Sequence, residues 1–260
     1  MKKTLISWLS LAAGSLLGTA YGAMEYTTDA STVFLWHMNE SSGSVITDSS
    51  TNGYNSNDGV ARVAGKFGNG IANAGVVQFG GHQGTLVNSS FTAEAWIKAP
   101  AGGWQSGLVT LVGMQEFVSP WGHNFYFGID SGKPAFGFYN GGAWTSGTAA
   151  SAIGVTDDWV HVACVYDLSK PQWNRAVYYV NGVLVATGGD NLDGNPTGSG
   201  YLYLGQSGAS GVSFTGAIDE ARLSSVARAA SELSPNLVPE PAAVALLALG
   251  GLALLRRRRN

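Results

Sequence analysis

Apolar and polar residues alternate with a period of two through most of residues 32–223, and this pattern most limits what the chain can fold into. The alternating runs are short, and clusters of Gly, Asn, Asp and Ser separate them. The dipeptide Asn181-Gly182 divides the runs 177–180 and 183–186, which indicates a tight hairpin because a type I′ turn needs a positive φ at both central positions. Many short strands without a long helical pattern predict an all-β fold in which two antiparallel sheets form a jelly-roll sandwich.

The N-terminal residues have the composition of a secretory signal peptide. Lys2 and Lys3 form a basic start, residues 5–17 are apolar, and Ala20-Tyr21-Gly22 offers a small-x-small cleavage site. We therefore expect residues 1–22 to be removed and the protein to be exported.

The C-terminal residues form a second targeting pattern. A Pro-Glu-Pro motif precedes 14 uncharged residues, 242–255, and four arginines follow. The apolar run is shorter than the roughly 20 residues of a membrane span, and the arginines favour the cytoplasmic side. An ordinary C-terminal membrane anchor is the alternative reading of this pattern.

Residues 238–260 resemble the PEP-CTERM sorting signal of Gram-negative bacteria. The residues that carry the resemblance are Pro239, Glu240, Pro241, Arg256, Arg257, Arg258 and Arg259. The resemblance implies a hydrophobic C-terminal helix that enters the inner membrane transiently through residues 242–255. It also implies an exosortase as the partner that cleaves the signal, and a final location at the cell surface or in the extracellular matrix.

Composition limits the number of domains and the kinds of partner expected for the middle of the chain. About 215 residues remain between the ends, which suits one β domain. Six of the 14 basic but only one of the 17 acidic residues lie in the ends, so the rest carries 8 basic and 16 acidic side chains. This acidic balance argues against binding nucleic acid or anionic lipid by electrostatic attraction. The single cysteine, Cys164, cannot form an internal disulfide, and its apolar neighbours predict a buried thiol.

Six pieces of the middle region resemble segments of laminin-G-like (concanavalin-A-like) jelly-roll domains, and they follow one another in the order found in that family. These pieces are residues 35–43 with 48–53, 65–70, 91–98, 159–163, 179–182 and 216–223. The resemblance implies one domain over residues 24–236, built from two packed antiparallel sheets. It implies nothing definite about a ligand, because function lies in sites added to such folds.

Two aspartates are candidate calcium ligands. Calcium takes six to eight oxygens from carboxylates and loop carbonyls. In the family that the chain resembles, the first and last strands lie side by side, which implies a structural Ca²⁺ held by Asp48 and Asp219 with carbonyls from residues 51–53. Alternatively, Asp48 makes an Asx-turn, and Asp219 pairs with Arg222 or with a backbone amide.

Aromatic residues in loops are candidate sugar contacts, because carbohydrate sites use aromatic faces with a few polar groups around them. Trp36, Trp96 and Trp159 lie in alternating strand patterns and are predicted to be core. The tryptophans in loops rich in Gly, Pro and Ser are Trp104, Trp121, Trp144 and Trp173. The predicted ligand-binding residues are Trp104, Trp121, His123, Tyr139 and Trp144. The alternative is that these aromatics cap the sheets under loops.

Catalysis is not predicted. A glycosidase needs two carboxylates facing one cleft, and the nearest pair, Asp219 and Glu220, is adjacent and so expected on opposite faces of a strand. The four histidines are scattered along the chain. We expect an exported, non-catalytic protein that binds polysaccharide or another surface component. A purely structural matrix or interaction protein and a divergent glycoside hydrolase are the alternatives.

Overall fold

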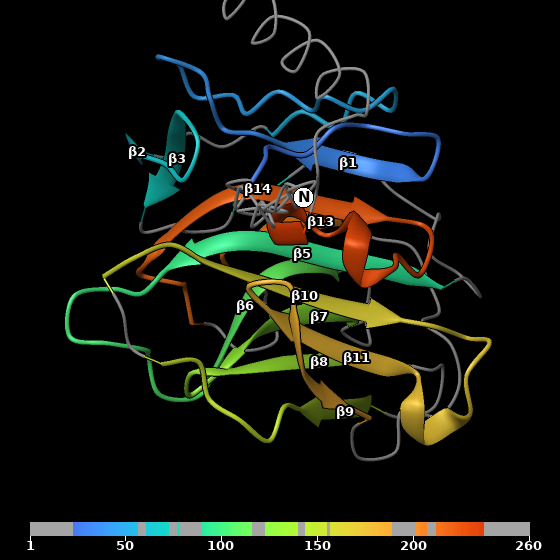
Figure 1. The fold of residues 1–260 in the computed structure, drawn as a ribbon. Helices are drawn as coiled ribbons and strands as arrows, with labels where there is room; N and C mark the ends of the chain where they lie inside the picture. Colours follow the sequence, from blue (N-terminus) through green and yellow to red (C-terminus); the bar gives the residue numbers. More distant parts are fainter. Residues whose placement is uncertain are drawn as a thin grey trace, which may run out of the picture. The chain divides into compact units, whose positions relative to one another are not determined.

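The computed structural model describes residues 23–56, 61–72, 77–78, 90–115, 123–139, 144–154, 157–188, 201–206 and 212–236 (Figure 1). All of them belong to one compact unit, Ala23–Leu237. The predicted signal peptide, residues 1–22, and the predicted sorting signal, residues 238–260, lie outside the described residues. In the described part, no helix combines the length and the apolar character that crossing a membrane requires.

The larger of two antiparallel sheets has eight strands, in the order β12-β11-β10-β5-β14-β3-β2, with β1 also paired to β14. Its strands are β1 (Thr32–Trp36), β2 (Arg62–Ala64), β3 (Asn69–Ala72), β5 (Phe91–Lys98), β10 (Val160–Tyr166), β11 (Ala176–Val180), β12 (Val183–Thr187) and β14 (Ala217–Ser224). The first strand therefore lies beside the last, as the family resemblance implied.

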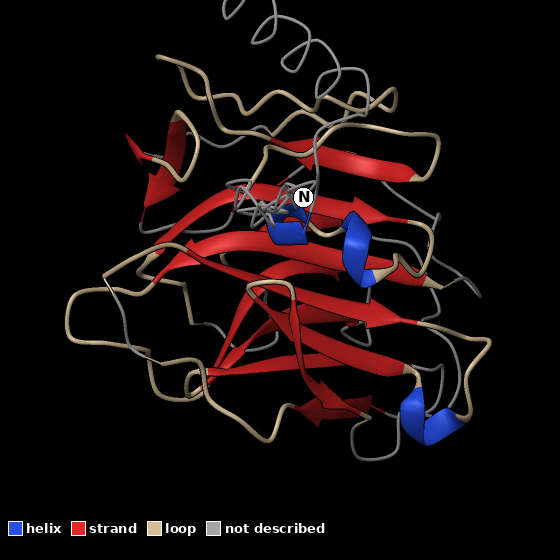
Figure 2. Ribbon diagram, in the orientation of Figure 1, coloured by secondary structure: helices blue, strands red, loops and turns tan. Residues whose placement is uncertain are grey.

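The smaller sheet has six strands in the order β4-β13-β6-β7-β8-β9. These are β4 (Val77–Gln78), β6 (Leu108–Gln115), β7 (His123–Asp130), β8 (Lys133–Tyr139), β9 (Trp144–Thr148) and β13 (Tyr201–Leu204). Helix is confined, among the described residues, to three short 3₁₀ turns, η1 (Gln172–Asn174), η2 (Ala230–Glu232) and η3 (Ser234–Asn236) (Figure 2). The prediction of an all-β, two-sheet sandwich is confirmed.

The core lies between the two sheets and follows the alternation of the sequence. Every second residue of β5 faces it, and so do the phenylalanines of β7 and β8. Five aromatic rings meet at its centre with neighbouring centroids 5.2–5.5 Å apart: Phe91, Phe125, Phe136, Phe138 and Tyr166. Burying each such side chain stabilises the folded state by about 1.5–3 kcal/mol relative to leaving it exposed. Cys164 is buried in this core, as predicted.

Two of the three tryptophans predicted to be core are fully enclosed. Trp36 lies in the core itself. Trp96 is also buried, but its indole packs against Phe67 and His161, which lie outside the inter-sheet core. Trp159 is only half-buried.

The hairpin predicted at Asn181-Gly182 is confirmed. Both residues have positive φ, 49° and 72°, and Val180 pairs with Val183 across the turn. The Asn181 side-chain oxygen accepts a hydrogen bond from the backbone N–H of His161 at 2.9 Å, which ties the hairpin to β10.

Candidate functional site

Strand pairing in the six-stranded sheet forms a continuous row of residues with one member from each strand. Strand pairing places Gln78, Tyr203, Gly113, Tyr126, Gly137 and Ser146 side by side in that order. Because the phenylalanines on either side of Tyr126 and Gly137 point into the core, these two residues face away from it.

Tyr126 lies flat across this face. A Cβ atom added to Gly137 would come within 2.7 Å of the ring and hydroxyl of Tyr126, so the ring occupies the space that a side chain at Gly137 would need. The hydroxyl is hydrogen-bonded to the Ser146 side chain. Burial raises the pKa of Tyr126, so at neutral pH the hydroxyl keeps its proton. The arrangement presents one face of an aromatic ring with polar groups at its rim.

The next outward row along the strands is made of small residues. Thr110, Gly128, Ala135 and Thr148 pair across β6 to β9. At Gly128 an added Cβ would lie 2.1 Å from the Val109 carbonyl oxygen, so only glycine fits there. Thr110, Gly128 and Ala135 are buried, whereas Thr148 at the edge of the row is exposed.

Three of the predicted ligand-binding residues meet at one end of this sheet. His123 begins β7, Tyr139 ends β8 and Trp144 begins β9, and Tyr139 pairs directly with Trp144. The register of β7 and β8 brings the backbone of His123 to the same strand ends. Trp121 lies outside the described residues.

Trp104 lies apart from these three. Its indole N–H donates to the Ile153 carbonyl at 3.0 Å, and its ring packs over Gly132 in the turn between β7 and β8. That turn is at the opposite end of β7 from His123, and the eight residues of β7 span about 25 Å. Trp104 thus caps the sheet under a loop, which is the alternative considered for the aromatic set.

Sequence reasoning did not single out Tyr126. The pattern Phe125-Tyr126-Phe127 facing Phe136-Gly137-Phe138 contained a usable signal, because alternation that puts the phenylalanines inside must put Tyr126 outside.

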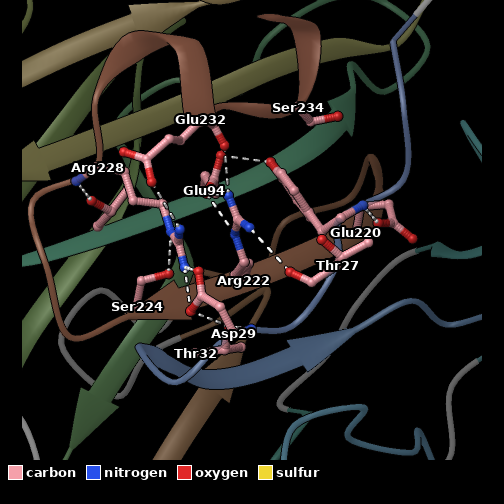
Figure 3. Close-up of polar contacts among 12 residues, drawn as sticks. Thr27, Asp29, Thr32, Glu94, Glu220, Arg222, Ser224, Arg228, Glu232 and Ser234 are labelled. Atoms are coloured by element: carbon pink, nitrogen blue, oxygen red, sulfur yellow. Dashed lines mark hydrogen bonds and ion pairs between the residues drawn. The ribbon is translucent and has the colours of Figure 1, made fainter. Parts of the chain in front are cut away.

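A second concentration of functional groups lies on the outer side of the eight-stranded sheet (Figure 3). Glu94 of β5, His161 of β10 and Arg222 of β14 are all buried there. Tyr26, which precedes the first strand, covers them: its hydroxyl donates to Glu94 Oε2 at 2.8 Å and lies 2.6 Å from His161 Nε2. The Arg222 guanidinium packs on the Tyr26 ring, 4.1 Å from its centroid. This cluster fixes the N-terminal segment of the domain onto the sheet.

The negative charge of Glu94 in this cluster is paired with the positive charge of Arg222. Burial alone would raise the pKa of Glu94, but the charge of Arg222 and the hydrogen bond from His161 outweigh it, so the pKa is lowered and Glu94 is ionised. Burial lowers the pKa of His161 more than Glu94 raises it, so the imidazole is neutral. Each of these groups is held by its neighbours, which indicates a structural role.

Asp219 and Glu220 lie on the same outer side of the sheet, so the expectation of opposite faces does not hold. A β-bulge in β14 between Asp219 and Arg222 adds one residue relative to β5, and Glu220 adopts a positive φ of 50°. Glu220 accepts a hydrogen bond from the Tyr26 backbone N–H at 2.9 Å and is paired with His37. Asp219 accepts from the backbone N–H groups of Phe67 and Glu220, and burial raises its pKa to about 7.

The two predicted calcium ligands contact different segments. Asp48 Oδ1 accepts from the backbone N–H groups of Leu35 and Ser50, and Oδ2 accepts from the Ser50 hydroxyl and the Tyr54 N–H. This is the Asx-turn alternative for Asp48, and the backbone amides on Asp219 match the alternative given for that residue. Within the described ranges, no group of three or more His, Cys, Asp or Glu side chains could hold a metal ion. Calcium binding stays a prediction from the resemblance alone.

Comparison with known proteins agrees with this architecture. Residues 71–234 match the family model of the concanavalin A-like lectin/glucanases superfamily. No curated protein matches the chain.

Solved structures share the fold at low identity. The binding domain of Paraclostridial Mosquitocidal Protein 1 is 16% identical with a TM-score of 0.54, over 78% of this chain and 50% of that one. Domain 4 of AbnA, a GH43 extracellular arabinanase from Geobacillus stearothermophilus in complex with arabinotriose, is 18% identical with a TM-score of 0.57, over 80% of this chain and 98% of that one. Trypanosoma rangeli sialidase in complex with sialic acid is 14% identical with a TM-score of 0.53, over 82% of this chain and 35% of that one. The chain thus spans half or less of the toxin and sialidase chains, and the shared fold occurs in binding domains and in a glycosidase alike.

Proposed function

Since the chain belongs to the concanavalin A-like lectin/glucanases superfamily, we propose that it is a non-catalytic protein that binds polysaccharide on the outward face of its six-stranded sheet. The observation that carries this proposal is the Tyr126 ring lying flat over Gly137 with its hydroxyl bonded to Ser146. Sugar rings stack on aromatic faces, and their hydroxyls pair with polar groups at the rim.

Further support comes from the neighbouring strand ends and from proteins of similar fold. The backbones of His123, Tyr139 and Trp144 meet beside this face, which puts residue types suited to sugar contacts next to Tyr126. The AbnA domain was solved with arabinotriose and the sialidase with sialic acid. A sugar ligand for this chain is consistent with both.

The carboxylates on the eight-stranded sheet support a non-catalytic role. Glu94, Asp219 and Glu220 are all buried. Glu94 is paired with Arg222, and Glu220 with His37. A glycosidase needs carboxyl groups that reach a bound sugar, and these three are engaged inside the protein.

Export and sorting complete the proposal. The signal peptide over residues 1–22 directs the chain out of the cytoplasm, and an exosortase cleaves the sorting signal at residues 238–260. The domain then acts at the cell surface or in the extracellular matrix. The support for this part is the sequence pattern at the two ends.

A glycan array and a binding isotherm test the proposal. Tyr126→Ala should weaken binding about tenfold or more, because an aromatic at the centre of a contact typically contributes about 2 kcal/mol. Tyr179→Ala is the matched control, since Tyr179 is a half-buried tyrosine on the other sheet. Equal binding by wild type and Tyr126→Ala would place the ligand elsewhere. Release of reducing sugar from a bound glycan would show a hydrolase, and self-association without glycan binding would favour a structural protein.

A further inference from the structure

Tyr26 is held on the outer side of the eight-stranded sheet through one small group of polar atoms. Its side chain is buried, its hydroxyl donates to Glu94 Oε2 at 2.8 Å, and the same hydroxyl lies 2.6 Å from His161 Nε2. The Tyr26 backbone N–H donates to Glu220 at 2.9 Å. The described residues 23–31, among which Tyr26 lies, form no strand. Side-chain contacts rather than a backbone ladder therefore hold this segment on the sheet.

The hydrogen bonds determine which ring nitrogen of His161 carries the hydrogen. The Tyr26 hydroxyl has one proton, and the Glu94 carboxylate accepts it. His161 Nε2 therefore faces two acceptors, the tyrosine oxygen at 2.6 Å and Glu94 Oε2 at 3.1 Å, so we assign the hydrogen of the neutral imidazole to Nε2. Nδ1 then carries a lone pair, and it is buried without a hydrogen-bond partner among the residues that the structure describes.

A second proton on His161 is costly while the segment is in place. It would bind at Nδ1 and create a buried N–H group that has no acceptor in the described part of the chain. It would also add a positive charge near Arg222, whose guanidinium already pairs with Glu94. Burial lowers the pKa of His161 more than Glu94 raises it, and Arg222 adds to the lowering. The closed cluster therefore excludes a proton that an imidazole in water takes up near pH 6.5.

Charged and titratable groups lie around His161 on each element packed against it. They are Tyr26 on the N-terminal segment, Glu94 on β5, Arg222 on β14, Tyr179 on β11, which pairs with Ala163, and Lys66, which lies over the Trp96 ring that contacts His161. Burial raises the pKa of both tyrosines, so their hydroxyls stay neutral. Proton uptake between pH 7 and 5 therefore falls on His161 rather than on the tyrosines or the ionised Glu94.

A second histidine acts on the same segment through one carboxylate and responds to acid in the opposite direction. His37 is half-buried and pairs with Glu220, which accepts the Tyr26 backbone N–H. The hydrogen bond with Glu220 raises the pKa of His37, so a proton on His37 strengthens its pairing with that carboxylate. An acid-induced release of the segment would therefore come from His161, and His37 offers a matched control.

We propose that His161 is an acid-sensitive latch: proton uptake at Nδ1 releases Tyr26 and its segment, residues 23–31, from the sheet. Opening lets water reach the imidazole, so the new N–H group finds a partner and its charge is hydrated. Opening also breaks the 2.6 Å hydrogen bond from the Ser234 hydroxyl to the Met24 carbonyl, so the release extends to the last described residues of the domain. The latch is independent of glycan binding, because Tyr126 lies on the other sheet.

Hydrogen exchange of the purified full chain measures the release, with rates corrected for the intrinsic effect of pH. The Tyr26 backbone N–H reports on docking, because it bonds Glu220 only while the segment is closed. Protection of this amide should be constant above about pH 6.5, the ordinary pKa of a histidine, and should fall by up to about tenfold per pH unit below it. The amides of β5 and β10, in the middle of the sheet, should keep their protection.

Two histidine variants separate the latch from its neighbour. His161→Gln keeps an N–H donor toward Tyr26 and Glu94 but takes up no proton, so protection of the Tyr26 amide should no longer depend on pH. His37→Gln is the matched control and should keep the acid-induced loss. A loss that persists in His161→Gln, or one that disappears in His37→Gln, would overturn the latch. Constant protection in the wild type from pH 7.5 to 5 would overturn it as well.

The wild type and Tyr26→Phe test the latch even where His161→Gln does not fold. The NMR signal of the His161 ring should titrate over the pH range in which the Tyr26 amide loses protection, and a ring that titrates while protection stays constant overturns the latch. Tyr26→Phe removes the hydroxyl bonded to Glu94 and should lower protection of the segment at pH 7 about tenfold. Equal protection in Tyr26→Phe and wild type would mean that this hydroxyl does not hold the segment, which also overturns the latch.

Discussion

Arg222 holds the Glu94 carboxylate with two nitrogens, Nε at 2.8 Å and Nη2 at 2.6 Å from the same Oε1 atom. Both side chains are buried, and they come from neighbouring strands whose positions 94 and 222 are direct partners. The other carboxylate oxygen accepts from Tyr26, so one glutamate joins two strands and the N-terminal segment.

Glu94→Gln should lower the free energy of unfolding by about 3–5 kcal/mol, because it leaves the Arg222 charge buried without its partner. Urea unfolding at neutral pH measures the change. Glu25→Gln is the control, since that carboxylate is exposed, and it should change stability by less than about 0.5 kcal/mol. A loss for Glu94→Gln as small as that of the control would contradict the structural role of the cluster.

Asp219 should make the protein less stable as pH rises from about 3.8 to 7. Burial raises its folded-state pKa to about 7 from an ordinary value of 3.8, so the folded state keeps a proton that the unfolded state loses. One such proton changes the free energy of unfolding by up to about 1.4 kcal/mol per pH unit. Asp219→Asn should remove this slope, which chemical denaturation at a series of pH values tests. An unchanged slope in the variant would show that Asp219 does not titrate in this range.

His37 should also stabilise the domain at lower pH, for a different reason. The hydrogen bond with Glu220 raises the pKa of His37 above its ordinary 6.5. The stabilisation is complete below the unfolded-state pKa and is lost as pH rises through the folded-state pKa. His37→Gln keeps a donor but loses the charge, so its stability should fall short of wild type more at pH 5.5 than at pH 9. An equal deficit at both pH values would mean that the charge contributes nothing.

The strands were predictable because their signals are local. Alternation across residues 91–98 and 160–166 marks two central strands, and Asn181-Gly182 marks their neighbouring hairpin. Hydrophobic period and turn chemistry act over a few residues, so they can be read without knowing which strands pair.

The buried cluster was not predictable, because its partners are far apart in sequence. Tyr26 lies ahead of the first strand, and its backbone N–H bonds a carboxylate 194 residues away. The positive φ of Glu220 occurs at a residue with no turn preference, so alternation misplaced the Asp219–Glu220 pair. Contacts between distant segments, rather than local preference, hold that conformation.

The predicted calcium site and the described hydrogen bonds predict different effects of Asp48→Ala on the Tm in calcium and in chelator. Bound calcium would make the Tm rise with free calcium and would make Asp48→Ala insensitive to chelator. The four hydrogen bonds accepted by Asp48 predict that Asp48→Ala lowers the Tm equally in calcium and in chelator, because it leaves buried donors unpaired. Thermal unfolding of wild type and variant under both conditions decides between them.

Gly137→Ala tests whether the flat position of Tyr126 matters for binding. The added Cβ would lie 2.7 Å from three atoms of the tyrosine side chain, so the ring has to lift away from the sheet. Because the outer end of a flexible side chain can move, the fold should tolerate the change, while glycan affinity falls about tenfold. Gly154→Ala is the matched control, since an added Cβ there meets nothing within 4 Å, and it should bind normally. Wild-type affinity in Gly137→Ala, together with an unchanged Tm, would remove Tyr126 as the platform on which the ligand stacks.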